Sequence, residues 1–245
     1  MILRQFLHQE PVGISYLIGC GGRGIAAVVD PVGDMGTYLQ AAEAGGMGIA
    51  YVIDTHVHAD HVSIGPMLAR STGAEYVLFA GADVAHPFKG VQDGDELPLG
   101  NVAVRVLHTP GHTPEHICLL VTDRTRTDEP WFVLTGHTLM VGDLGRTELA
   151  TSAEDGARNL YRSARRLAEL PDHVEVMPGA YAGSVCGRAL SGKPWSTIGF
   201  EKRHNKALRI SDEAEFIAHM TAETPPPPPE AALLREMNAG RQEIA

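Results

Sequence analysis

Three histidines and one aspartate crowd a six-residue segment, His-Val-His-Ala-Asp-His at residues 56–61. The segment follows a nearly continuous apolar run at residues 49–54, which is typical of a strand buried on both faces. In extended backbone the side chains of residues i and i+2 point the same way, so His56 and His58 can reach one point in space. Asp60 and His61 follow and can face an adjacent point. Imidazole and carboxylate are ligands of divalent zinc and iron, so the spacing predicts a metal centre rather than a set of surface-loop histidines.

Two later segments place a histidine where a turn or a strand end can present it. His112 follows a Pro-Gly pair, which makes a tight turn and so a rigid loop suited to a ligand. His137 follows Gly136 at the end of a β-type run. His108 and His116 flank the tight turn, and we expect each of them to make structural hydrogen bonds.

The elements that must position these residues alternate in the first half of the chain and become mainly strands in the second. Strand-type runs lie at residues 14–18, 25–29, 49–54, 75–79, 102–106, 116–121, 131–134 and 174–177. Helix-type segments lie at residues 37–44 and 62–71, and a third begins after Ser152 with a capping-box pattern. This order predicts an α/β architecture in which sheets pack together and helices cover them.

Residues 19–24, Gly-Cys-Gly-Gly-Arg-Gly, match the G-x-G-x-x-G pattern of dinucleotide-binding loops. That fingerprint needs a helix to begin at the loop, so that the helix N-terminus faces the pyrophosphate. A strand-type run follows here instead. We therefore expect a hairpin turn that uses glycine for positive φ.

Composition argues against nucleic acids and membranes as partners. The 245-residue chain has 20 basic and 30 acidic residues and a net charge of −10, and an acidic surface repels phosphate backbones. No apolar stretch approaches the roughly 18 residues of a membrane span, and the N-terminus lacks the basic-then-apolar order of a secretory signal. Three widely spaced cysteines argue against a disulfide framework. These features predict a cytoplasmic protein with neither nucleic-acid nor membrane partners.

Three motifs carry a resemblance to a known family: His-x-His-x-Asp-His at 56–61, Thr-Pro-Gly-His-Thr at 109–113 and Thr-Gly-x-Thr-Leu at 135–139. They resemble the metallo-β-lactamase superfamily, and within it the persulfide dioxygenases, their rhodanese-fused bacterial relatives and the hydroxyacylglutathione hydrolases. Residues 141–146 and 191–201 resemble the rhodanese-fused persulfide dioxygenases in particular. The resemblance implies an αββα sandwich with the metal at one edge between the sheets.

The expected domain boundary lies near Phe200. Residues 1–200 are assigned to the metallo-β-lactamase-like domain and residues 201–245 to a C-terminal tail. The tail is polar, with one amphipathic helix at 212–221 and then five prolines at 225–229, which form a stiff extended spacer.

Two departures from the family pattern bear on the number of metals. His137 stands where the family usually has an aspartate, and Ala180 stands where it has a histidine of the second metal site. A second metal would then keep Asp60 and His61 as its assured ligands, and two ligands hold a transition metal weakly. We predict one divalent metal.

The resemblance favours Fe(II) on His56, His112 and His137, with His58 as a further ligand, and an iron-dependent activity like that of the glutathione persulfide dioxygenases. Zn(II) is the alternative, because three histidines and a water lower the pKa of that water and give a nucleophile for thioester hydrolysis of the hydroxyacylglutathione hydrolase type. Asp60 and His61 are the predicted catalytic groups. A third possibility is a catalytically impaired protein that binds a thiol-containing ligand.

Further residues carry weaker expectations. By resemblance Arg146 lies beside the site and pairs with a substrate carboxylate such as that of glutathione, or else forms a structural salt bridge. Tyr181 either reaches the substrate or fills space, and Cys186 either carries sulfur or is packed and inert. The expected partner is a small-molecule thiol or persulfide, and the sequence leaves open a homo-oligomer and a separate rhodanese.

Overall fold

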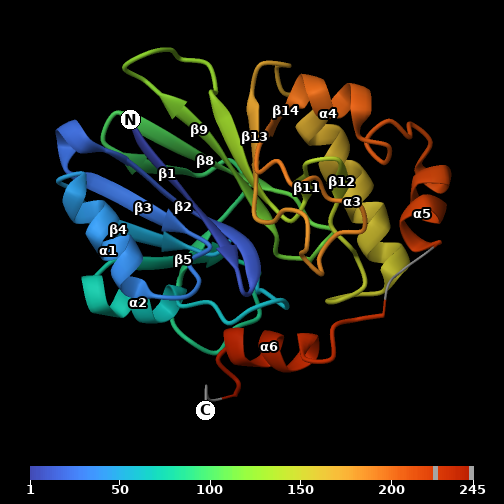
Figure 1. The fold of residues 1–245 in the computed structure, drawn as a ribbon, viewed down its shortest axis with the longest axis horizontal. Helices are drawn as coiled ribbons and strands as arrows, with labels where there is room; N and C mark the ends of the chain where they lie inside the picture. The colour runs from blue at the N-terminus through green and yellow to red at the C-terminus, as the bar shows by residue number, and fades with distance from the viewer. Residues whose placement is uncertain (223–225, 243–245) are drawn as a thin grey trace.

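Two six-stranded sheets pack face to face in the computed structural model, which describes residues 1–222 and 226–242, and helices cover their outer faces (Figure 1). The first sheet has strand order β1 (Ile2–Gln9), β2 (Val12–Cys20), β3 (Ile25–Val29), β4 (Gly48–Ile53), β5 (Glu75–Phe79), β6 (Lys89–Val91). The second has strand order β14 (Ser196–Thr197), β13 (Glu175–Pro178), β10 (Phe132–Gly136), β9 (Ile117–Asp123), β8 (Val102–His108), β7 (Glu96–Leu99). A short ribbon of β11 (Leu139–Met140) and β12 (Asp143–Leu144) lies beside the second sheet. The predicted αββα sandwich is confirmed.

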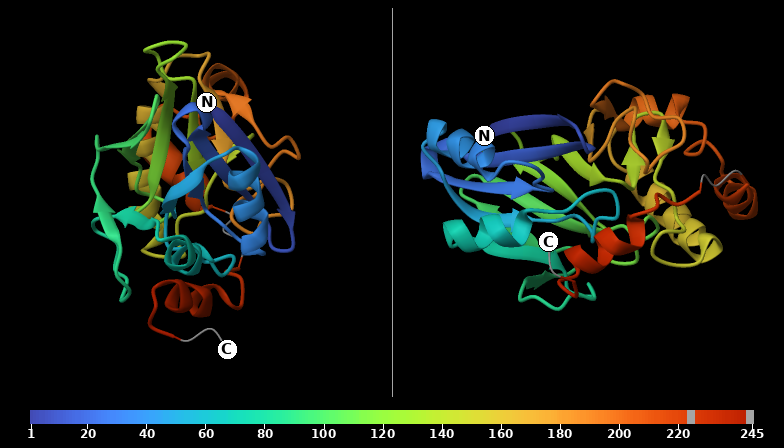
Figure 2. Two further views of the ribbon diagram at one scale, coloured as in Figure 1. Left: turned by 90° about the vertical axis from the view of Figure 1, so that its left-hand side faces the viewer. Right: turned by 60° about the horizontal axis from the view of Figure 1, so that its bottom comes forward.

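Each layer is held by its own apolar cluster. Residues of both sheets, among them Ile18, Val29, Val104 and Leu119, form the core between the sheets. α1 (Met35–Ala44) and α2 (Gly65–Thr72) pack on the outer face of the first sheet, and α3 (Ala153–Ala168), α4 (Ile198–His204) and α5 (Glu213–Thr221) pack on the side of the second (Figure 2). α3 begins as predicted, because the Ser152 hydroxyl accepts a hydrogen bond from the amide of Asp155.

The ends of several strands meet at one edge of the sandwich. β3, β4, β5 and β6 run parallel, and β10 runs parallel to β13. The loops that leave β4 and β10 carry His56 and His137, and the amide of Ile117 at the start of β9 donates to the carbonyl oxygen of Thr55 at 2.9 Å. The topology therefore brings both histidines to the same edge.

The glycine-rich residues 19–24 form the predicted hairpin. β2 and β3 pair antiparallel across a short 3-10 turn, Gly21–Arg23, and Gly24 closes it with φ of 64°. That left-handed φ is one that glycine adopts without strain. The hairpin interpretation is confirmed.

The C-terminal segment contains more helix than the sequence pattern indicates. α5 matches the predicted amphipathic helix, but α4 and a further helix, α6 (Ala231–Asn238), were not predicted. Pro226–Pro229 lie outside helices and strands, whereas Pro225 lies outside the described residues. Every helix within residues 1–222 and 226–242 is too short or too polar to cross a membrane.

Candidate metal centre

A buried carboxylate at the end of β3 anchors the loop that carries the first histidines. Asp30 is buried, and its carboxylate accepts hydrogen bonds from the amide and hydroxyl of Thr55 at 2.7 and 2.9 Å. The same carboxylate lies 3.2 Å from Nε2 of His58. Asp30 itself adopts a positive φ of 48°, which is uncommon outside glycine and marks a backbone held by its surroundings. Asp30 therefore fixes where the segment 55–58 begins.

Three histidines from three separate loops converge beside this anchor. One ring nitrogen from each of His56, His112 and His137 lies within 4.8 Å of the others, and all three side chains are buried. Nδ1 of His112 lies 2.7 Å from the backbone oxygen of Arg146, which can only accept, so Nδ1 carries the proton. The hydroxyl of Thr55 donates to Asp30 and so accepts from Nδ1 of His56 at 2.9 Å. These partners leave Nε2 of both rings unprotonated, as in metal-binding histidines, and Nε2 of His112 lies 3.3 Å from Nδ1 of His137.

The electrostatics of the cluster favour the metal-binding form of the rings. Burial, together with the neighbouring His137, lowers the pKa of His112 to about 3. Burial and the adjacent histidines also lower the pKa of His56 well below its usual range, and burial lowers that of His137. The three imidazoles are therefore neutral at neutral pH, and a neutral imidazole is the form that binds a cation.

His58 belongs to a different group from the one that the spacing indicates. Its Nε2 faces Asp30, and its Nδ1 lies 3.7 Å from the carboxylate of Asp60, which in turn lies 3.1 Å from Nδ1 of His61. Burial alone would lower the pKa of His58, but the Asp30 carboxylate raises it well above its usual value. The structure thus brings His58, Asp60 and His61 together as a second cluster beside the three-histidine cluster.

The last helix holds the backbone of this loop from outside. The side-chain amide of Asn238 donates to the carbonyl oxygens of His58 and His61, at 2.9 and 2.7 Å, and its oxygen accepts from the amide of Ser63 at 2.9 Å. Arg235 donates to the carbonyl oxygen of Val57 at 2.9 Å. These α6 residues contact the loop through long-range pairs that local sequence patterns do not reveal.

The flanking histidines have the expected structural roles. Nε2 of His116 accepts from the backbone amide of His137 at 3.0 Å, and its Nδ1 lies within hydrogen-bond distance of the Thr109 and Thr138 hydroxyls. Nε2 of His108 lies 2.9 Å from the carbonyl oxygen of Pro114. His116 therefore positions the backbone of a cluster member.

Arg146 and Tyr181 are both held by protein contacts. The Arg146 guanidinium forms an ion pair with Glu148 and donates to the carbonyl oxygen of Val185 at 3.1 Å. The Tyr181 hydroxyl donates to the carbonyl oxygen of His8 at 2.7 Å. Substrate contact by either residue stays a prediction, whereas Arg146 already positions His112 through its backbone oxygen.

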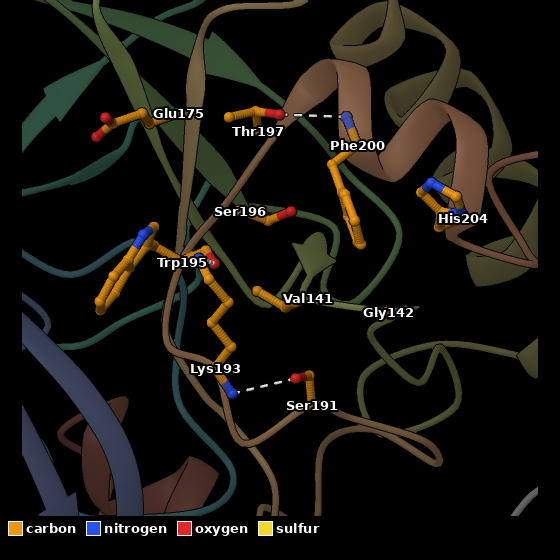
Figure 3. A pocket seen from close by; sticks show the side chains of 10 residues that line it. All are labelled: Val141, Gly142, Glu175, Ser191, Lys193, Trp195, Ser196, Thr197, Phe200 and His204. Carbon is orange, nitrogen blue, oxygen red and sulfur yellow. Dashed lines mark hydrogen bonds between the residues drawn. The ribbon is translucent and has the colours of Figure 1, made fainter.

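The two segments with the finer resemblance, residues 141–146 and 191–201, pack against each other. The amide of Ser191 donates to the oxygen of Val141 at 3.0 Å, and the buried Glu201 accepts from the amide of Gly142 at 3.0 Å. Between them lies a cavity of about 350 Å³, lined by Trp195, Phe200 and others that belong to neither cluster (Figure 3). These segments therefore support each other, and the first contacts the metal centre through the backbone oxygen of Arg146 at His112.

The chain is similar to known proteins of one superfamily. A model described as the metallo-beta-lactamase superfamily matches residues 12–179. The chain belongs to this superfamily. One relative is a probable metallo-hydrolase of Burkholderia pseudomallei, 32% identical, with 91% of this chain and 86% of the relative covered. A hydroxyacylglutathione hydrolase of Polaromonas sp. is 36% identical over 67% of this chain, and the match spans 60% of that enzyme.

Solved structures of the superfamily share the whole architecture. A metallo-beta-lactamase from Staphylococcus aureus superposes with a TM-score of 0.93 at 33% identity, covering 100% of this chain and 74% of that chain. ETHE1 from Myxococcus xanthus superposes with a TM-score of 0.83 at 32% identity, covering 99% of this chain and 100% of that chain. Family membership and the buried histidine and aspartate clusters together support divalent metal binding.

Proposed function

We propose that the chain is an iron-dependent dioxygenase of a small persulfide such as glutathione persulfide, with one reacting metal held by His56, His112 and His137. The donor set is the observation that carries the proposal: three buried imidazoles gather without a carboxylate in the group. The full-length similarity to ETHE1 and the resemblance of residues 141–146 and 191–201 to persulfide dioxygenases favour this branch of the superfamily.

The charge of the donor set suits a sulfur anion. Three neutral imidazoles leave the +2 charge of a bound cation uncompensated, which strengthens binding of an anionic persulfide compared with a site that holds a carboxylate. Bound Fe(II) would bind O₂ and pass to it the electrons that the outer sulfur of the persulfide loses as it is oxidised to sulfite. The protein holds the donors rigidly, because His56 and His112 are each oriented by a partner on the other ring nitrogen.

We assign Asp60 a role in proton transfer. Burial alone would raise its pKa, but His61 and His137 hold that pKa well below its usual range, so the carboxylate is ionised. Its Oδ2 lies 4.0 Å from Nε2 of His137, beside the three-histidine cluster. Asp60 is therefore ionised and can act as a weak base towards a water or a protonated persulfide at the metal, with His61 beside it at 3.1 Å.

The test is O₂ uptake and sulfite formation with glutathione persulfide, on protein purified without air, together with its metal content. We expect bound iron and O₂ uptake, abolished by His112→Ala and kept in His108→Ala, which alters a histidine of the same turn outside the cluster. Protein that carries zinc and consumes no oxygen would refute the proposal.

A zinc-dependent thioester hydrolase is the second candidate. The 36% identity to a hydroxyacylglutathione hydrolase favours it, and three histidines with an ionised carboxylate nearby can hold zinc and orient its water. Zinc-loaded protein should then hydrolyse acylglutathione thioesters. Absence of turnover in both assays, with a thiol ligand still bound, would favour the catalytically impaired binding protein.

A further inference from the structure

The turn that follows β3, at residues 30–32, is held by side chains from two other elements. The hydroxyl of Ser15 on β2 donates to the carbonyl oxygen of Asp30 at 2.7 Å. The hydroxyl of Tyr38 on α1 accepts from the amide of Val32 at 2.9 Å and lies 2.8 Å from the carbonyl oxygen of the same residue. The backbone of the turn is therefore bound at both of its ends.

Ser15 and Tyr38 are polar groups in an otherwise apolar layer. Side chains alternate along β2, and Ile14 and Tyr16 belong to the core between the sheets, so Ser15 faces the outer layer under α1. Ser15 and Tyr38 are both 0% exposed, and their hydroxyls lie 3.0 Å apart. Nε2 of His8 lies 2.9 Å from the Ser15 hydroxyl. Burying a hydroxyl is unfavourable unless it forms hydrogen bonds, and here those bonds go to the turn.

The turn needs such support because Asp30 has a left-handed backbone, with a φ of 48°. Residues other than glycine disfavour this conformation. In it, the Asp30 carboxylate accepts from the amide and hydroxyl of Thr55 at 2.7 and 2.9 Å. The Thr55 hydroxyl lies 2.9 Å from Nδ1 of His56. A chain of hydrogen bonds thus runs from Ser15 through Asp30 and Thr55 to a histidine of the three-histidine cluster.

We propose that Ser15 and Tyr38 are positioning residues of the metal centre. They hold Asp30 in its left-handed conformation, and the Asp30 carboxylate then orients His56 through Thr55. Loss of partners that orient a ligating histidine weakens metal binding about 10- to 100-fold. The inference rests on the three-histidine metal position of the proposed function but not on its reaction, because the iron and zinc candidates both use His56.

Co(II) titration of the metal-free protein, followed by visible absorption, compares variants that lack one hydroxyl. We expect Ser15→Ala and Tyr38→Phe each to raise the dissociation constant of Co(II) about tenfold. Tyr161→Phe is the matched control, since it removes a tyrosine hydroxyl that donates to the backbone oxygen of Ser211, between α3 and the segment before α5. This control should bind Co(II) as wild type does. Unchanged binding in Ser15→Ala, or an equal loss in Tyr161→Phe, would overturn the proposal.

A double-mutant cycle tests whether Ser15 acts through Asp30. Asp30→Gly removes the carboxylate and leaves a residue that adopts a positive φ without strain. In that background Ser15→Ala should change the Co(II) dissociation constant by less than about twofold, because its route to the metal centre is already lost. Effects of the two substitutions that multiply would show that Ser15 acts by another route, which contradicts the proposal.

Amide hydrogen exchange of the metal-free protein gives a readout that needs neither bound metal nor a folded Asp30 variant. The amide of Thr55 donates to Asp30, so its exchange should become about tenfold faster in Ser15→Ala. The amide of Trp131, which donates to the oxygen of Val121 at 2.8 Å in the second sheet, should keep its rate. A Thr55 rate that stays as in wild type, or that rises only together with that of Trp131, would refute the positioning role.

These experiments separate the positioning role from the proposed function. None of them measures turnover, so failure of the proposed reaction leaves their results unchanged. Wild-type protein that binds no Co(II) would refute the three-histidine metal position itself, whereas exchange at Thr55 would still decide whether Ser15 fixes the loop through Asp30.

Discussion

The side chain of Asn238 donates a hydrogen bond of 2.7 Å to the backbone oxygen of His61 across 177 residues of sequence. Its second bond of 2.9 Å goes to the oxygen of His58, so one side chain spans the loop that contributes residues to both clusters. α6 therefore holds a loop of the metal centre in place, although its residues lie outside both clusters.

Replacing Asn238 with alanine should loosen this loop. The variant leaves the oxygens of His58 and His61 and the amide of Ser63 without their partner, which should cost about 1–3 kcal/mol in the free energy of unfolding. Metal affinity should fall about tenfold or more, as it does when partners that orient ligands are lost. Urea unfolding and metal titration measure the two effects. Leu233→Ala is the control, since its side chain is exposed on the same helix. Equal losses in both variants would contradict this role.

The metal-free protein should be destabilised by acid through His112. Its folded-state pKa is about 3, below the roughly 6.5 of an unfolded histidine, so the unfolded chain binds the proton first as the pH falls. Stability from this group is therefore present above pH 6.5 and is lost below it, by about 2 kcal/mol between pH 7 and pH 5. Chemical unfolding at the two pH values should show a loss of stability that is smaller in His112→Gln than in wild type by about 2 kcal/mol, because His56 and His137, whose pKa values burial also lowers, still contribute. The exposed His173 provides a control variant, His173→Gln, that should behave as wild type.

Gly111→Ala should disrupt the turn that presents His112. Gly111 has a φ of 149°, and a Cβ there would lie 2.5 Å from the backbone of Leu160 in α3. The helix cannot move aside without breaking the contact of Ser163 with the Pro110 oxygen, at 2.7 Å. We expect a loss of about 3 kcal/mol in thermal or chemical unfolding and weaker metal binding. Gly94→Ala, which has a positive φ but open space around it, should cost about 1 kcal/mol.

His137→Asp should weaken binding of an anionic substrate. A carboxylate adds a negative charge beside the metal, and at about 4 Å a unit charge is worth several kcal/mol even at an effective dielectric constant near 20. We expect the KM for persulfide to rise about tenfold while the iron content is kept. Steady-state oxygen uptake measures KM and kcat separately. An unchanged KM would show that the charge of the donor set does not control substrate binding.

Local patterns in the sequence were sufficient to predict the fold, because the buried strands and the first helices each show the hydrophobic periodicity of their own secondary structure. Residues 49–54 and 131–134 indicate strands, and β4 and β10 occupy those places. The hairpin at residues 19–24 was also predictable, since the residues after it favour a strand rather than a helix.

The grouping of the ligands was harder to predict. The rule that side chains i and i+2 share a face holds for extended backbone, but β4 ends at Ile53, so it does not apply to His56 and His58. Ser15 and Asn238 act on the centre through contacts that no short-range pattern encodes. α6 had one usable signal, a run of strong helix formers at residues 231–237.

The bond between Asn238 and the loop at His58 sets an order of events during synthesis. The partners are 180 residues apart, and at about 5–20 residues per second the ribosome needs roughly 9 to 36 seconds to add the second after the first. During that interval the nascent chain contains its first histidines on a loop that the hydrogen bonds of Asn238 do not yet hold. We therefore expect correct metallation to be a late step, because a cation bound earlier would meet a loop that Asn238 has not yet fixed.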